Sequence, residues 1–409
     1  MKKGLANFPV CNKPNHIGGK MNPLKAKKIR VKDTLRSLSI SMLFLSLLAS
    51  FFIACPGQKE EIKIGVVLPM TGGLSAFGQE GKQAIDMAVE KLNANGGILG
   101  RKVRVIYEDG QGTPAQTVNA VKKLIETDKV VALIGEVASS NTLAAAPIAQ
   151  EKKIPLLVPA STNVEITKVG DYIARVCFID AEQGRAMADF CYHQLKKRRA
   201  VLILDQSSDY SVGLAQEFIR RFKELGGEVL GQEAIQQGTS DFRTQLAKVS
   251  AKKADFIYVP VNYQEAGLIL KQAKELGIKT DIVGSDAWSS PKLFEIAGDA
   301  ANGQFITAHF SPDAPDSIVR FFVDEFKQKY GINPSNMSAL SYDAANLLFD
   351  AIRRAGTTKS DKIKDAINST RGFRGVTGEI TLDSMRNPIK PIVILKTDKG
   401  QFAYAGQVK

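Results

Sequence analysis

The sequence predicts an α/β protein built from two similar, doubly wound lobes. Short apolar runs typical of buried parallel strands alternate with segments of helical periodicity. The alternation occurs twice, with similar spacing, which favours two lobes over one large sheet. The chain has 409 residues, enough for two hydrophobic cores.

The first β-α-β unit lies between residues 62 and 110. Its opening run, IKIGVVL, is apolar at Ile62, Ile64, Val66, Val67 and Leu68, as expected of a strand buried on both faces. A loop with three glycines follows, and then apolar residues recur at helical spacing over 84–92. Asn95-Gly96-Gly97 should end this helix, because glycine readily adopts the left-handed conformation of a C-terminal cap. Residues 103–107 alternate as in the next strand.

The remaining segments continue the alternation. In the first series we expect a helix from Pro114, a strand at 130–135, a helix at Asn141–Lys152 and a strand at 154–160. The second series contains strands at 200–205, 228–235, 255–261 and 281–286, with helices at Ser211–Leu225, 242–249 and Gln264–Leu276. Toward the C-terminus we expect strands at 305–310, 390–397 and 402–408, and helices at Ser317–Tyr330, Ser338–Ala355 and Lys359–Ile367.

Three strings carry a family resemblance: PMTGGLSAFG, NGGILGRK and YEDGQGTPAQ, in this order around the first helix. They resemble the start of periplasmic binding proteins of the leucine/isoleucine/valine type, and the similarity extends from about residue 60 to residue 409. The resemblance implies the type I periplasmic binding protein fold, with two Rossmann-like lobes joined by a three-crossing hinge near residues 180, 310 and 386. Lobe 1 would comprise 62–180 plus 311–385, and lobe 2 would comprise 181–310 plus 386–409.

The net charge of +13 is concentrated at the N-terminus. Residues 1–54 hold ten Lys/Arg and one Asp, whereas the remainder holds 45 basic and 41 acidic residues. No basic stripe interleaved with aromatic residues occurs in that remainder. A mildly basic body with interspersed charges indicates a solvated surface, so we expect no nucleic-acid partner.

The basic N-terminal residues precede an apolar run at 38–54, the pattern of a secretory signal peptide. A retained membrane helix is the alternative, although 17 residues are few for a membrane span. Phe52-Ile53-Ala54-Cys55 resembles a bacterial lipoprotein box, in which Leu usually stands at the place of Phe52. The resemblance implies lipidation of Cys55, a linker at 55–61 and a periplasmic or cell-surface protein anchored to a membrane. Translation could start at Met1 or at Met21.

Neither a metal nor a cofactor is expected. Cys and His residues do not form a cluster with metal-ligand spacing, and the glycine loop does not fit the dinucleotide fingerprint G-x-G-x-x-G. No base stands out beside a nucleophile, so an enzyme of dehydrogenase type is disfavoured. Cys177 and Cys191 could pair in an oxidising compartment or remain isolated buried thiols.

Two first-lobe loops suit a carboxylate. Ligands of open parallel sheets bind beyond the carboxyl ends of strands. EVASSNT follows the strand at 130–135 and STN follows the strand at 154–160, so each places hydroxyls and amides near a helix N-terminus. Each loop alone also fits an ordinary helix cap. The resemblance implies that Ser139 and Thr162 bind a ligand carboxylate, with Ala138, Ala160 and Ser161 offering backbone groups.

The second lobe supplies the candidate site for the ligand ammonium group. Asp286 ends the strand at 281–286, where the family commonly has Glu as the acceptor for a ligand ammonium group; a capping role is the alternative. Phe77 and Tyr210 match aromatic positions of the family pocket. Asn262, or its neighbour Tyr263, stands where relatives have Tyr, and Asn262 leaves the ligand side chain open. Trp288 could cover the pocket or simply pack in the core.

The resemblance implies a function in transport. A monomeric binding protein would capture an amino acid, by family default a branched-chain one, and deliver it to the permease and ATPase of an ABC importer. Because carboxylate and ammonium sites lie on opposite lobes, only a closed cleft would satisfy both ends of the ligand. The alternative is a sensing protein of the same fold that binds an amide or another small carboxylate.

Overall fold

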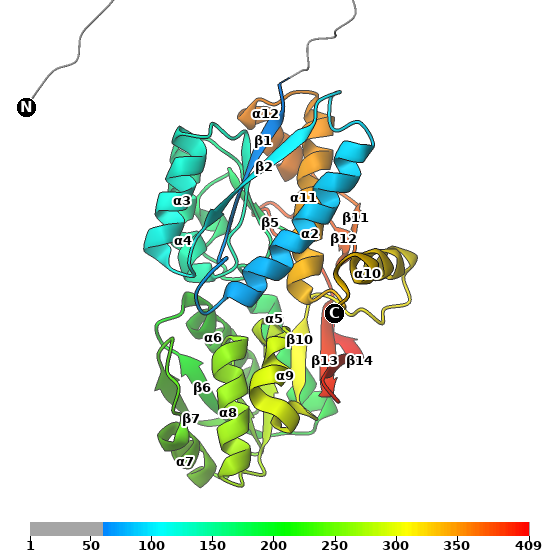
Figure 1. Ribbon diagram of the computed structural model, residues 1–409. Helices are drawn as coiled ribbons and strands as arrows, with labels where there is room; N and C mark the ends of the chain where they lie inside the picture. The colour runs from blue at the N-terminus through cyan, green and yellow to red at the C-terminus, as the bar shows by residue number, and fades with distance from the viewer. Residues whose placement is uncertain (1–59, 409) are drawn as a thin grey trace, which may run out of the picture. The chain divides into compact units, whose positions relative to one another are not determined.

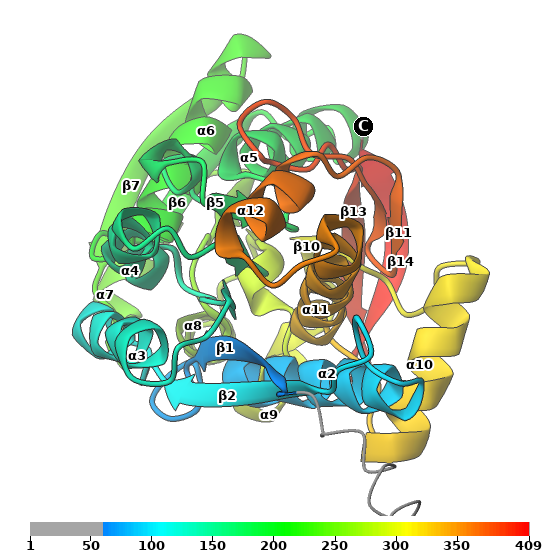
Figure 2. The ribbon, with the colours of Figure 1, turned by 90° about the horizontal axis from the view of Figure 1, so that it is seen from above.

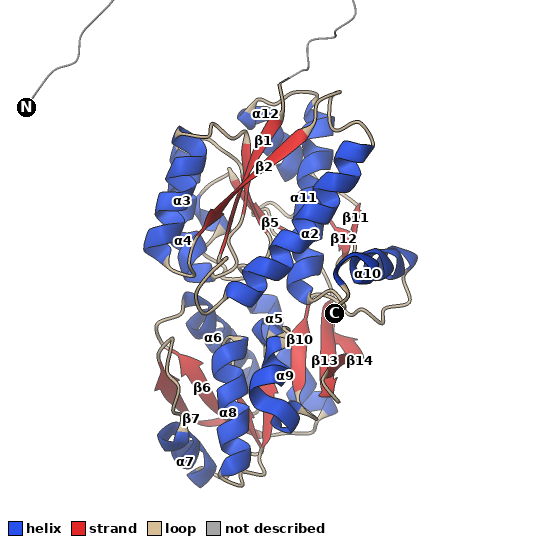
Figure 3. Ribbon diagram, viewed as in Figure 1, coloured by secondary structure: helices blue, strands red, loops and turns tan. Residues whose placement is uncertain are grey.

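The computed structural model describes residues 60–408, which form two sheets flanked by helices (Figures 1 and 3). The predicted signal peptide, the lipidation of Cys55 and the choice between Met1 and Met21 lie outside the described residues. Within residues 60–408, no helix combines the length and apolar character that crossing a membrane requires.

The first sheet has five parallel strands in the order β2-β1-β3-β4-β5. Its strands are β1 (Ile62–Leu68), β2 (Val103–Asp109), β3 (Ala132–Ile134), β4 (Leu156–Val158) and β5 (Ile173–Arg175). The helices of this lobe are α2 (Ser75–Ala94), α3 (Pro114–Glu126), α4 (Ser139–Glu151), α11 (Asn336–Ala355) and α12 (Ser360–Asn368).

Helices cover both faces of this sheet. Because successive side chains of a strand point to opposite faces, Ile64 and Val66 pack in the cluster that contains α2 and α11, whereas Val67 packs with α3 and α4. The helix α10 (Ser317–Tyr330) lies outside α2, and a hairpin of β11 (Phe373–Gly375) and β12 (Gly378–Ile380) lies against α11 (Figure 2). Burial on two sides therefore explains why β1 is apolar at both odd and even positions from Val66 to Leu68.

The second sheet has seven strands in the order β14-β13-β10-β9-β8-β6-β7, of which β13 and β14 run antiparallel to their neighbours. Its strands are β6 (Arg199–Asp205), β7 (Glu228–Ile235), β8 (Phe256–Tyr258), β9 (Asp281–Gly284), β10 (Phe305–Ala308), β13 (Ile392–Asp398) and β14 (Gln401–Val408). Its helices are α5 (Asp180–Asp189), α6 (Asp209–Glu224), α7 (Arg243–Ala251), α8 (Tyr263–Glu275) and α9 (Lys292–Ala297).

The chain passes between the two sheets three times. It leaves the first sheet after β5, returns to its helices after β10 and enters the second sheet again at β13. The predicted fold class, two doubly wound α/β lobes joined by three crossings, is confirmed. Cys177 and Cys191 are both buried and free, so they do not form a disulfide with each other.

Candidate ligand-binding site

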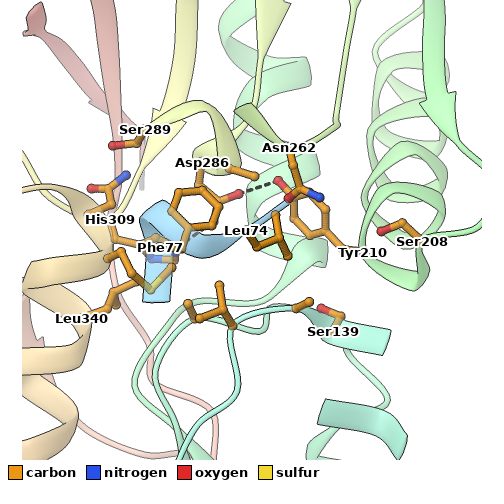
Figure 4. A pocket seen from close by; sticks show the side chains of 16 residues that line it. Leu74, Phe77, Ser139, Ser208, Tyr210, Asn262, Asp286, Ser289, His309 and Leu340 are labelled. Atoms are coloured by element: carbon orange, nitrogen blue, oxygen red, sulfur yellow. Dashed lines mark hydrogen bonds and ion pairs between the residues drawn. The ribbon is translucent and has the colours of Figure 1, made fainter. Parts of the chain in front are cut away.

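A cavity lies between the two lobes, where loops at the carboxyl ends of strands from both sheets meet (Figure 4). It measures about 50 Å³, several times the space that one water needs. Seven of the ten predicted site residues line it: Phe77, Ala138, Ser139, Ala160, Tyr210, Asn262 and Asp286. The other lining residues are Leu74, Val137, Ser208, Ala287, Ser289, His309, Asn336, Met337 and Leu340.

Ser139 forms the first-lobe end of the cavity. It is the first residue of α4, so its main-chain N–H has no acceptor within the helix. Its Oγ accepts a hydrogen bond from the Asn163 N–H at 3.3 Å, and the residue is almost fully buried. Figure 4 shows Ser139 across the cavity from Asn262 and Asp286. The hydroxyl and the helix N-terminus together make this end attractive to an anion.

Glu136 fixes the loop before α4. Its carboxylate accepts hydrogen bonds from the N–H groups of Val137 and Ala138, at 2.7 and 2.8 Å. Burial raises the pKa of this carboxyl to about 7, against the lowering effect of these bonds. The Ala138 carbonyl accepts from Thr142. The backbone groups that Ala138 was expected to offer are therefore bonded within the loop, and Ala138 contributes to the cavity wall.

Ser161 and Thr162 do not line the cavity. The Ser161 Oγ lies 2.6 Å from the Thr142 Oγ1 and donates to the Glu136 carbonyl at 3.0 Å, so it braces the two loops against each other. The Ser161 carbonyl accepts from buried Arg175 at 2.9 Å. Thr162 is fully buried, and its Oγ1 has no hydrogen-bond partner within residues 60–408. Both residues lie behind the cavity wall.

Asp286 forms the second-lobe end. Its Oδ1 accepts from the Tyr210 hydroxyl at 2.6 Å (Figure 4). The same oxygen accepts from the Gln183 amide at 2.8 Å. Its Oδ2 lies 3.0 Å from His309 Nε2. An ionised carboxylate only accepts hydrogen bonds, so these contacts fix Nε2 of His309 as the protonated nitrogen. Three donors hold the carboxylate at the cavity.

Burial favours the neutral form of His309. It is buried and stacks on Phe178, with ring centroids 3.5 Å apart. Burial lowers the pKa of His309, and the hydrogen bond to Asp286 only partly opposes this. Neither Lys nor Arg is among the described lining residues. The charge of Asp286 is therefore left without a cationic partner at the cavity, which suits a ligand ammonium group.

For Trp288, the sequence allowed either a cover over the pocket or packing in the core. Trp288 is completely buried outside the cavity, and its Nε1 donates to the Val259 carbonyl at 3.1 Å. The ring occupies space left by Gly284, where an added Cβ would lie 2.3 Å from a ring atom. Trp288 is a core residue, because the strand glycine beneath it leaves room for the indole.

We expect Trp288→Phe to lower the stability of the protein without changing its choice of ligand. The substitution removes a buried hydrogen bond and leaves a void, which together cost roughly 1–4 kcal/mol. Urea unfolding would measure the loss, and calorimetry at a temperature where the variant is folded would measure ligand affinities. A changed order of ligand preference would show that the indole acts on the site after all.

Hydrogen bonds connect the two lobes on both sides of the cavity. Asn163 of the first lobe donates to the Asp209 carbonyl at 2.8 Å, and the Asp209 N–H donates to the Ser140 Oγ at 3.0 Å. On another side, the Tyr263 hydroxyl donates to the Gly73 carbonyl at 2.9 Å, while its ring meets Phe77 edge-on. The lobes are thus in contact, and Tyr263 belongs to this contact while Asn262 lines the cavity.

The described residues contain no group of three His, Cys, Asp or Glu side chains placed to hold a metal ion. The chemistry of the cavity is that of binding: hydroxyls and a helix N-terminus at one end, a carboxylate at the other, and an apolar wall that includes Leu74, Phe77 and Leu340.

This chain belongs to the periplasmic binding protein family, whose model matches residues 61–401. It is similar to a leucine-binding protein from Thermotoga maritima (40% identity, TM-score 0.82, covering 85% of this chain and 98% of that one). It is also similar to a branched-chain amino acid transporter substrate-binding protein from Streptococcus pneumoniae, solved with isoleucine (32%, TM-score 0.82, covering 85% and 99%). A solute-binding protein of an ABC transporter from Rhodopseudomonas palustris, solved with 3,4-dihydroxybenzoic acid, is more distant (25%, TM-score 0.78, covering 85% and 97%).

The predicted family is therefore confirmed, and the coarse function follows from it. The named relatives are leucine-, substrate- or solute-binding proteins, one of them of an ABC transporter, and this chain has the fold and the interlobe cavity of such a protein.

Proposed function

We propose that this protein is the extracytoplasmic substrate-binding lipoprotein of an ABC importer and that it captures an α-amino acid between its lobes. The main support for this proposal is that the two ends of the cavity differ in charge. Ser139 and the N-terminus of α4 lie at one end, and the Asp286 carboxylate lies at the other without a Lys or Arg among the described lining residues. A zwitterion matches this polarity, because its carboxylate and ammonium groups each meet the opposite partial or full charge.

Branched-chain amino acids are the first candidates. Leu74, Phe77, Met337 and Leu340 provide an apolar wall that an aliphatic side chain could contact. The Thermotoga and Streptococcus proteins, named for leucine and branched-chain amino acids, support this choice. Micromolar affinity, about −8 kcal/mol, is within reach of charge-assisted hydrogen bonds plus one buried side chain.

Capture proceeds by hinge closure in this proposal. The groups for the two ends of the ligand come from different lobes, so an open cleft satisfies one end only. Binding then shifts the population toward the closed state. The closed protein, monomeric and held at the membrane through Cys55, would present the ligand to a permease and its ATPase.

A ligand without an amine is the second candidate, either for transport or for sensing. The relative solved with 3,4-dihydroxybenzoic acid favours it, because that ligand has a carboxyl group and no ammonium group. Such a ligand would need hydrogen-bond donors at the Asp286 end, for example hydroxyls.

A thermal-shift screen distinguishes the candidates. The purified protein is heated with each of the twenty amino acids and with common amides and carboxylates. A ligand that binds only the folded state at 100 times its dissociation constant adds about 2.7 kcal/mol of stability and raises the melting temperature. We expect leucine, isoleucine, valine or another amino acid of similar size to raise it. A rise with simple acids alone would reject the amino-acid proposal.

A further inference from the structure

The side chain of Asn336 has two unused hydrogen-bonding groups at the cavity. Asn336 begins α11, lines the cavity and is 5% exposed. Neither its Oδ1 nor its Nδ2 has a hydrogen-bond partner within residues 60–408. Its neighbour Ser335, by contrast, bonds Glu80 through its hydroxyl. A buried amide that lacks both partners is unfavourable and rare in folded proteins.

Asn336 lies in the wall of the cavity in which the proposed ligand would bind. Met337 and Leu340 of the same helix line the apolar wall, so the amide interrupts a surface otherwise suited to an aliphatic side chain. Asn336 and Ser289 also border a second hollow of about 320 Å³, which adjoins the cavity at these two residues. Asn336 and Ser289 therefore lie in the wall that the cavity and this hollow share.

We infer that Asn336 reads the end of the ligand side chain and that the site prefers an amino acid whose side chain carries a hydroxyl or a carboxamide over the aliphatic amino acid of the same shape. This inference rests on the proposed function and refines its side-chain class. A hydroxyl or carboxamide both donates and accepts, so it can bond Oδ1 and Nδ2 of Asn336. An aliphatic side chain buries the amide and leaves it unpaired, and sites built to bond a polar group discriminate strongly against analogues that lack it.

Two pairs of nearly isosteric amino acids test the inference: threonine with valine, and asparagine with leucine. Calorimetry on the full protein gives the affinity ratio within each pair. We expect the polar member to bind about tenfold more tightly in the wild type. Asn336→Leu, which preserves side-chain volume, should lower each ratio at least tenfold. Asn336→Ser, a second variant with a smaller polar group, should retain a preference for the polar members.

Asn346→Leu serves as the matched control, because Asn346 is an amide on the same helix α11 that does not line the cavity. It should leave the ratios within a factor of about three. Ratios that do not respond to Asn336→Leu, or that respond equally to Asn346→Leu, would overturn the assignment to Asn336 while the amino-acid proposal stands. If none of the four amino acids binds the wild type, whereas a simple acid does, the proposed function and this inference both fail.

Discussion

Asp286→Asn is expected to weaken amino-acid binding about 100-fold or more while the protein still folds. The substitution preserves the shape of the side chain and removes the charge that faces the ligand ammonium group. Loss of one partner from a buried, hydrogen-bonded charge pair typically costs 2–5 kcal/mol, because the other charge is left unpaired. Calorimetry with the tightest amino acid found in the thermal screen measures the change, and circular dichroism checks the fold.

Tyr210→Phe is the control for this experiment. It removes the hydroxyl that donates to Asp286 at 2.6 Å but keeps the carboxylate. We expect a loss of less than about tenfold, the size of one hydrogen bond. Equal affinities of Asp286→Asn and the wild type would exclude Asp286 as the ammonium partner. The ammonium group of the bound amino acid would then have its partner elsewhere in the cavity.

The fold was predictable because its signals are local. The apolar run of β1 needs cover on both faces, and Asn95-Gly96-Gly97 ends α2 with two glycines in left-handed conformations (φ 91° and 78°). Each signal depends on neighbouring residues only, and the alternation of such segments gives the doubly wound pattern.

The cavity was predictable where it follows strands. The rule that ligands meet the carboxyl ends of parallel strands led to Ser139, Ala160 and Asp286, all of which line it. His309 directly follows β10, so the same rule could have found it. Asn336 follows no strand: it begins a helix far along the chain, and only the return of the chain to the first lobe brings it to the cavity. Such juxtapositions depend on tertiary packing.

In the proposed hinge closure, a buried carboxyl group should couple closing of the cleft to pH. Glu80 lies on α2 of the first lobe, is 8% exposed, and accepts hydrogen bonds from Ser290 of the second lobe at 2.8 Å and from Ser335 at 2.5 Å. Burial raises the pKa of Glu80 from its ordinary value of 4.5 to about 7, although the two serines and Lys292 lower it. Opening the cleft would break the contact with Ser290 and hydrate the carboxyl, returning its pKa toward 4.5.

We therefore expect the closed form to bind a proton more tightly than the open form. A group with a raised pKa contributes stability that is fully present below its ordinary pKa and is lost as the pH rises through its raised value. Lowering the pH from 8 to 6 should thus favour closure, and with it ligand affinity, by roughly tenfold. His309 adds little to this change because its pKa is lowered. The Glu136 carboxylate bonds Val137, Ala138 and Asn141, all of the first lobe, so we expect its raised pKa to affect folding rather than closure.

Glu80→Gln should remove the pH dependence, because glutamine is neutral throughout and keeps an acceptor for Ser290. Its affinity at pH 8 should approach that of the wild type at pH 6. Calorimetry with one amino acid at pH 6, 7 and 8 measures both proteins. A wild-type slope that survives in Glu80→Gln would assign the titration to another group and leave Glu80 as a structural contact. A flat wild-type profile would mean that Glu80 remains as buried in the open cleft as in the closed one, so that closure does not desolvate it.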